Sequence, residues 1–269
     1  MDLTRIATSN GDGKMEKYVY VAASSVIVVI LVIVVLVVYF PAKSGAELTV
    51  LCGGSFKEPA EKLVGTFEEE TGIDAEISFG QCEDHLPHIN AHDVGDIYIA
   101  HTPYMKYTED AQACSRWVLV GYVRPVLVVK KGNLLNLEKI EDLARPGLKV
   151  ALPNPEFATC GEMVEKLLKK KGIWDDVKKN VGNAFFRSHA QTGTAIKVGN
   201  RDAGMMWNGV AHNWLDALDI IPTPYEYDQV IEVGVIGLSY SKHPELVEEF
   251  LKFSEKKGEE IFGESGFTK

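Results

Sequence analysis

Three of the four cysteines, Cys52, Cys82 and Cys160, stand where an apolar run gives way to a turn and then to a helical pattern. His85 follows Cys82 by three residues, a spacing that places both on one face of a helix. Thiolate and imidazole groups suit soft metals and thiophilic metalloids, whereas hard oxyanions prefer N–H and hydroxyl donors. These junctions therefore raise the question of which kind of small ligand they would hold.

The stretch 48–61, LTVLCGGSFKEPAE, favours an anion at one of these junctions. The apolar run 48–51 predicts a strand, and Gly53 and Gly54 allow a tight turn and close approach to a ligand. Ser55 and Glu58 have the spacing of a capping box, which predicts the start of a helix. The free N–H groups and dipole of such a helix end favour negative charge. Thr159 and Glu162 repeat the same spacing.

An enzyme is disfavoured, and no cofactor is expected. Cys82 and His85 are the residue types of a nucleophile and its base, but no third orienting residue and no nucleophile signature accompany them. The chain also contains no phosphate-loop, GxGxxG or CxxC motif. The sequence therefore predicts a binding protein.

Residues 18–40 predict a single-pass membrane anchor, because these 23 residues carry no charge and would span a hydrocarbon core of ~30 Å. A cleaved signal peptide is the rival interpretation, but its apolar region would be only ~7–15 residues long. Arg5, Lys14 and Lys17 precede the span and only Lys43 follows closely, so residues 1–17 are predicted to be cytoplasmic. The bulk of the chain would then be extracytoplasmic, periplasmic or at the cell surface.

The charge of the exported part argues against nucleic acid as a partner. The whole chain has 28 Lys+Arg and 38 Asp+Glu. Residues 1–45 hold four basic and three acidic groups, which leaves 24 against 35, a net charge of −11. Nucleic acid and anionic membrane surfaces both require a basic face. A small anion held by local N–H donors remains compatible with this charge.

From residue 47 onwards the pattern alternates between strands and helices, which predicts parallel sheets flanked by helices in two α/β lobes. The segments GDIYIAHTPYMKY, VRPVLVVKKGN and PEFATCGEMVEKLLKKKGIWDDV, in this order after the stretch 48–61, resemble the periplasmic molybdate/tungstate-type binding proteins of ABC importers. The resemblance implies a type II periplasmic-binding-protein fold with hinge strands, and an ABC permease as partner. It implies one lobe from 47–120 and 235–269 and another from 121–234, with crossovers near 120–126 and 230–238.

The resemblance also implies the ligand-binding positions, which fall on Ser55, Cys82, Cys160, His189 and Trp207. In that family the oxyanion is held by hydroxyls and backbone N–H groups. Ser55 matches, but cysteine stands at 82 where the family has serine, and at 160 where it commonly has alanine. The expected ligand is molybdate or tungstate. The alternative is a soft metal or metalloid such as copper, zinc or arsenite, held by Cys82, Cys160, Cys52 and His85, in a transporter component or a sensor.

The even number of cysteines leaves disulfides open as a third explanation. A bond between Cys82 and Cys160 would lock the lobes together, whereas Cys82 with Cys114 or Cys52 would stay within one lobe. Mere packing also remains open, since a lone cysteine often behaves as a small buried hydrophobe.

Overall fold

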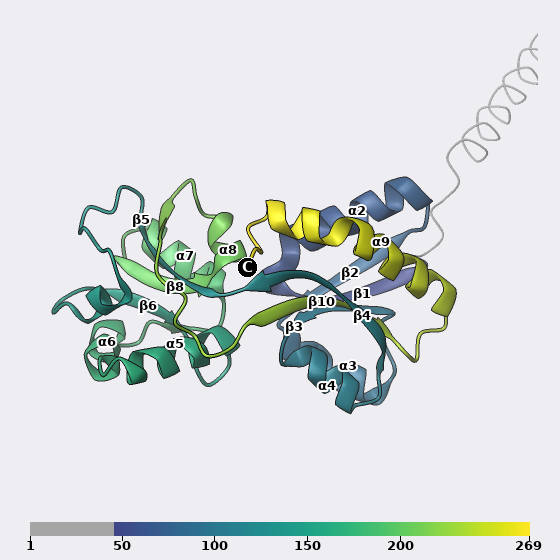
Figure 1. The fold of residues 1–269 in the computed structure, drawn as a ribbon, viewed down its shortest axis with the longest axis horizontal. Coiled ribbons are helices and arrows are strands. Elements are labelled where there is room, and N and C mark those ends of the chain that lie inside the picture. The colour runs from purple at the N-terminus through teal and green to yellow at the C-terminus, as the bar shows by residue number, and fades with distance from the viewer. Residues whose placement is uncertain (1–45) are drawn as a thin grey trace, which may run out of the picture. The chain divides into compact units, whose positions relative to one another are not determined.

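The expected strands and helices form two lobes, each built on a five-stranded sheet with helices on both faces (Figure 1). The structure is a computed structural model that describes residues 46–269, which form one compact unit. The predicted tail 1–17 and anchor 18–40 lie outside the described residues. Within 46–269, no helix is both long and apolar enough to cross a membrane.

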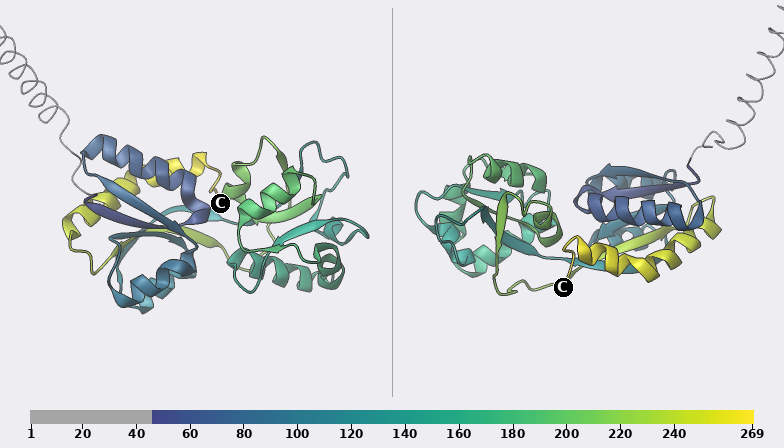
Figure 2. Two further views of the ribbon diagram at one scale, coloured as in Figure 1. Left: turned by 180° about the vertical axis from the view of Figure 1, so that it is seen from behind. Right: turned by 90° about the horizontal axis from the view of Figure 1, so that it is seen from above.

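The first lobe has the strand order β2-β1-β3-β10-β4. Helices α2 and α9 pack against each other on one face of the sheet, and α3 and α4 cover the other face (Figures 1 and 2). The bounds of these elements are β1 (Leu48–Gly53), α2 (Lys57–Thr71), β2 (Ala75–Gly80), α3 (Cys82–Ala91), β3 (Ile97–His101), α4 (Tyr104–Asp110), β4 (Cys114–Val123), β10 (Ile231–Leu238) and α9 (Pro244–Glu264).

The second lobe has the strand order β7-β6-β8-β5-β9. Helices α5 and α6 cover one face, and α7 and α8 cover the other (Figure 1). The bounds are β5 (Pro125–Lys130), the 3-10 helix η2 (Ile140–Ala144), β6 (Val150–Pro153), α5 (Thr159–Lys170), α6 (Trp174–Val181), β7 (Phe185–Phe186), α7 (His189–Lys197), β8 (Ala203–Trp207), α8 (Asn208–His212) and β9 (Leu218–Ile221).

Both sheets are mixed, so the expectation of parallel sheets was correct only in part. β1 pairs in parallel with β2 and β3, and β6 pairs in parallel with β7 and β8. The antiparallel partners are the strands next to the chain crossings: β10 runs antiparallel to β3 and β4, and β5 to β8 and β9. A strand that returns from the other lobe enters the sheet from the opposite end, which reverses its direction.

The chain crosses between the lobes at Arg124 and through residues 222–230. Val123 still pairs with Ile231 in the first sheet, and Pro125 already pairs with Trp207 in the second. The expected boundaries at 120/121 and 234/235 therefore cut through β4 and β10. Residues 121–123 and 231–234 belong to the first sheet, because the hydrogen-bonded ladder continues to its end.

The buried amide of Asn208 joins the two lobes near these crossings. Its Nδ2 donates to the carbonyl oxygens of Gly266 at 2.9 Å, Thr268 at 3.0 Å and Tyr122 at 3.3 Å. Its Oδ1 accepts from the Arg124 backbone N–H at 3.1 Å. The side chain thus uses both donors and its acceptor to hold α8 against the first crossing and the C-terminal segment.

Candidate functional site

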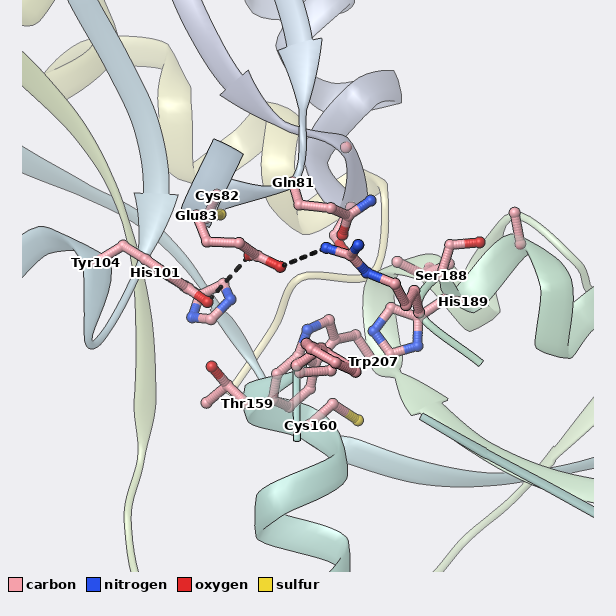
Figure 3. A pocket seen from close by; sticks show the side chains of 17 residues that line it. Gln81, Cys82, Glu83, His101, Tyr104, Thr159, Cys160, Ser188, His189 and Trp207 are labelled. Atoms are coloured by element: carbon pink, nitrogen blue, oxygen red, sulfur yellow. Dashed lines mark hydrogen bonds and ion pairs between the residues drawn. The ribbon is translucent and has the colours of Figure 1, made fainter. Parts of the chain in front are cut away.

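A cavity of about 160 Å³ lies between the lobes, and side chains from both line it (Figure 3). All five positions implied by the resemblance contribute to its wall: Ser55, Cys82, Cys160, His189 and Trp207. The structure therefore brings together residues separated by more than 150 positions in the sequence.

Each of the two lobes presents the beginnings of helices to this cavity. Cys82 begins α3 in the first lobe, and Thr159 and His189 begin α5 and α7 in the second. Gly54 and Ser55 line it from the 3-10 turn η1 (Gly54–Phe56), which leads into α2. The first N–H groups of a helix have no partner within the helix and carry its positive dipole end. The cavity wall is therefore rich in donors for an anion.

Neither of the two expected capping boxes is formed. Ser55 lies in η1 and makes no side-chain cap, since α2 begins two residues later at Lys57. Thr159 is the first residue of α5, where the N-cap is Ala158 and no side chain caps the helix. Neither the Ser55 hydroxyl nor the Thr159 hydroxyl is therefore used to cap a helix. Ser188 does cap α7, because its hydroxyl accepts the Gln191 backbone N–H at 3.3 Å.

The four thiols are free, so the structure contains none of the disulfides left open by the sequence. Burial raises the pKa of Cys82 to about 12 and raises the pKa of Cys160 and Cys52 well above the usual range. These groups are therefore neutral thiols at physiological pH, the form that binds soft metals weakly.

The residues of the metal alternative do not share one site. Cys82 and Cys160 line the cavity, but Cys52 is fully buried in β1 and His85 points its Nε2 at the Cys52 carbonyl, 3.3 Å away. In the part of the chain that the structure describes, no group of three or more His, Cys, Asp or Glu side chains is placed to hold a metal ion.

Two neutral histidines flank Trp207 in the cavity wall. The ring centroids of His101 and His189 lie 5.7 and 5.9 Å from that of Trp207. Burial lowers the pKa of His101 to about 4; burial, with a smaller contribution from His101, lowers that of His189 to about 3. His101 Nδ1 faces the Thr102 carbonyl and must donate to it, so its Nε2 is an acceptor. His189 Nδ1 is buried without a hydrogen-bond partner.

A charged pair that was not expected from the sequence also lines the cavity: Glu83, which is labelled in Figure 3, and Arg187. Glu83 in the first turn of α3 accepts a hydrogen bond from the Tyr104 hydroxyl at 3.2 Å. Its other oxygen lies 3.6 Å from Nη2 of Arg187, which comes from the second lobe. The Arg187 guanidinium also lies over the Phe157 ring, 5.1 Å from its centroid. Acidic residues are common in first helical turns, so the sequence offered no specific signal for Glu83.

The family profile for bacterial extracellular solute-binding proteins matches residues 48–268. The chain belongs to this family. It is therefore a solute-binding protein and not an enzyme, as expected, and its relatives act outside the cytoplasm. A putative binding protein of Haemophilus influenzae is 24% identical over 231 residues, covering 82% of this chain and 91% of that protein.

Solved structures share the fold. The periplasmic molybdate-binding protein of Azotobacter vinelandii superimposes with a TM-score of 0.68 at 17% identity, over 83% of this chain and 99% of that one. Iron-bound HitA of Pseudomonas aeruginosa gives a TM-score of 0.64 at 17% identity, over 80% and 83%. One of these neighbours is named for an oxyanion and the other holds iron. The fold alone therefore does not determine which ligand binds. The side chains that line the cavity must determine it.

Proposed function

We propose that the protein is the extracytoplasmic binding component of an ABC importer and that it holds a small tetrahedral oxyanion between its lobes. The observation that supports this best is the convergence of helix beginnings from both lobes on one cavity. Molybdate and tungstate are the first oxyanions to test, because the sequence resemblance and the Azotobacter neighbour both point to them. The partner would be an ABC permease.

The wall suits an anion without a full counter-charge. Both cavity histidines are neutral, and the Arg187 and Glu83 charges face each other. Binding would come from backbone N–H groups and from the hydroxyls of Ser55 and Thr159. Each hydrogen bond to a charged group contributes ~1.5–3 kcal/mol. Several of them, supplied by both lobes, would hold the lobes closed around the ligand.

Titration calorimetry on the full-length protein tests this proposal, with molybdate, tungstate, sulfate, phosphate and arsenate as anions and zinc and copper(I) as soft cations. Cys82→Ser is the deciding variant, since serine and cysteine are nearly isosteric. An oxyanion site predicts that this change leaves anion binding intact or improves it. Metal binding by the wild type that disappears in Cys82→Ser, with no oxyanion bound, would establish the soft-metal alternative and contradict the proposal.

The anchor belongs to the same proposal. With residues 18–40 in the membrane and 1–17 inside the cell, the binding lobes would stay tethered near the permease. N-terminal sequencing of the mature protein is the direct measurement. A mature chain that begins near Glu47 would show that the segment is removed.

A further inference from the structure

The cavity contains hydrogen-bond acceptors as well as donors, which a fully deprotonated oxyanion cannot use. Glu83 is the clearest of them: its carboxylate lines the cavity and faces its interior (Figure 3). A carboxylate offers about four lone-pair positions. Tyr104 uses one, and Arg187 at 3.6 Å makes a long contact with the other oxygen. Acceptor capacity is therefore left over on the wall of an anion site.

A second acceptor comes from the neighbouring strand end. His101 lines the same cavity, and its Nδ1–H is committed to the Thr102 carbonyl, which leaves Nε2 as a lone pair. The Tyr104 ring connects these two groups, with its hydroxyl on Glu83 and its centroid 5.1 Å from that of His101. The first lobe thus presents an acceptor-bearing surface opposite the helix beginnings of the second.

Resting on the proposed function, we infer that the ligand is an oxyanion that carries a proton, such as hydrogen phosphate or hydrogen arsenate. The O–H group of this ligand would donate a hydrogen bond to the Glu83 carboxylate, while its bare oxygens would accept from the helix beginnings. Molybdate, tungstate and sulfate have no proton at neutral pH. They would place lone pairs against the Glu83 carboxylate, which costs like-charge repulsion and leaves the acceptor unpaired.

Arg187 does not remove this discrimination. Its guanidinium compensates the charge of Glu83, so the pair is close to neutral toward an approaching anion. The net charge of this pair acts in the same way on protonated and unprotonated dianions. Only a direct hydrogen bond to the carboxylate distinguishes them, which makes Glu83 a specificity residue instead of a general electrostatic barrier.

The test compares ligands of equal charge. At about pH 8.5, above the second ionisation of phosphate, hydrogen phosphate and hydrogen arsenate are dianions, as are sulfate and molybdate. Calorimetry on the full-length protein should show the protonated pair binding about 10- to 100-fold more tightly, the range that one charge-assisted hydrogen bond supplies. Glu83→Gln should abolish most of that ratio, because an amide can donate to an unprotonated oxygen.

Glu58→Gln is the matched control. Glu58 also stands in the first turn of a helix, α2, but does not line the cavity, so its replacement should leave the ratio unchanged. Arg187→Gln should shift all four affinities in the same direction.

Wild-type affinities for sulfate and molybdate within about threefold of those for the protonated pair would overturn the inference, and so would an unchanged ratio in Glu83→Gln. In both cases oxyanion binding itself would stand. If none of the four anions binds to the wild type or to Glu83→Gln, the proposed function is wrong, and the inference falls with it.

Discussion

The Sγ atom of Cys82 fills the space beside Gly53, where a Cβ on residue 53 would lie only 2.4 Å from it. The thiol is therefore a packing element of the cavity wall. Gly53 has φ −61° and ψ 128°, a conformation that alanine adopts freely, so the constraint is one of space. We expect Gly53→Ala to lower the free energy of unfolding by about 1–3 kcal/mol through overpacking, measured by urea denaturation.

The double variant Gly53→Ala/Cys82→Ala should recover part of the lost free energy of unfolding, because the second change removes the sulfur atom that clashes. Gly65→Ala is the control: a Cβ there meets nothing within 4 Å, and a helical glycine replaced by alanine should stabilise slightly. Equal stabilities for Gly53→Ala and the double variant would contradict this account.

Ser55→Ala and Thr159→Ala should weaken oxyanion binding without destabilising the fold. Neither hydroxyl caps a helix, so unfolding free energies should stay within about 0.5 kcal/mol of the wild type. Each affinity should fall about 10-fold, as expected for one lost hydrogen bond to a charged group. Calorimetry and thermal melting measure the two effects separately.

Ser188→Ala, in contrast, should destabilise the fold. Its hydroxyl caps α7 through the Gln191 N–H, so we expect a cost of about 0.5–2 kcal/mol. If Ser55→Ala and Thr159→Ala melt as low as Ser188→Ala, these hydroxyls have a structural role that their positions do not suggest.

Stability of the ligand-free protein should decline as the pH falls from about 6.5 towards 4. His101 and His189 are neutral in the folded state, with pKa values lowered to about 4 and about 3, whereas both would gain a proton in the unfolded chain below its ordinary pKa of 6.5. Their contribution is present above pH 6.5 and is lost on acidification. Carboxylates titrate in the same range, so the useful quantity is a difference between variants.

His189→Gln should flatten the stability profile between about pH 6.5 and 4 relative to the wild type. The control is His243→Gln, an exposed histidine before α9 that should leave the profile unchanged. Parallel profiles for the wild type and His189→Gln would show that His189 does not contribute to the acid sensitivity.

Asn208→Asp should strongly destabilise the junction of the lobes although it preserves the shape of the side chain. The new carboxylate would face the three carbonyl oxygens that Nδ2 now contacts. We expect a loss of about 3 kcal/mol or more in urea denaturation. Asn180→Asp is the matched control, since Asn180 donates to two carbonyls, of Leu143 and Arg145, at a more exposed position away from the junction. Equal losses in the two variants would contradict a special role for Asn208.

Elements bounded by clear turn signals could be predicted from the sequence, although not always to the residue. The strand predicted at 48–51 forms as β1, and the helix predicted after Gly53 and Gly54 forms as α2, which ends at Gly72 with φ 76°. Very short strands could not be predicted in this way. A two-residue strand such as β7 has no periodicity of its own, since its pairing with β6 defines it.

Some residues of the candidate site could likewise be predicted from the sequence, and others could not. Positions tied to a strand-to-helix junction, such as Ser55 and Cys82, could be placed from the local pattern. Tyr104 and Arg187 could not, because they reach the cavity through tertiary packing: one follows β3 by three residues, and the other lies between β7 and α7. The incorrect capping box at Ser55 has a local cause. A 3-10 turn precedes α2, which moves its start beyond the serine.

The position of β10 sets the order in which the lobes can be completed during synthesis. This strand lies between β3 and β4 and connects them, yet it is made after the whole second lobe. The second lobe is continuous from β5 to β9 and can fold as soon as it emerges. The first lobe, although it begins earlier in the chain, lacks the link between its two halves until residue 238 has been made. We therefore expect nascent chains that end before β10 to contain a folded second lobe and an open, protease-sensitive first lobe.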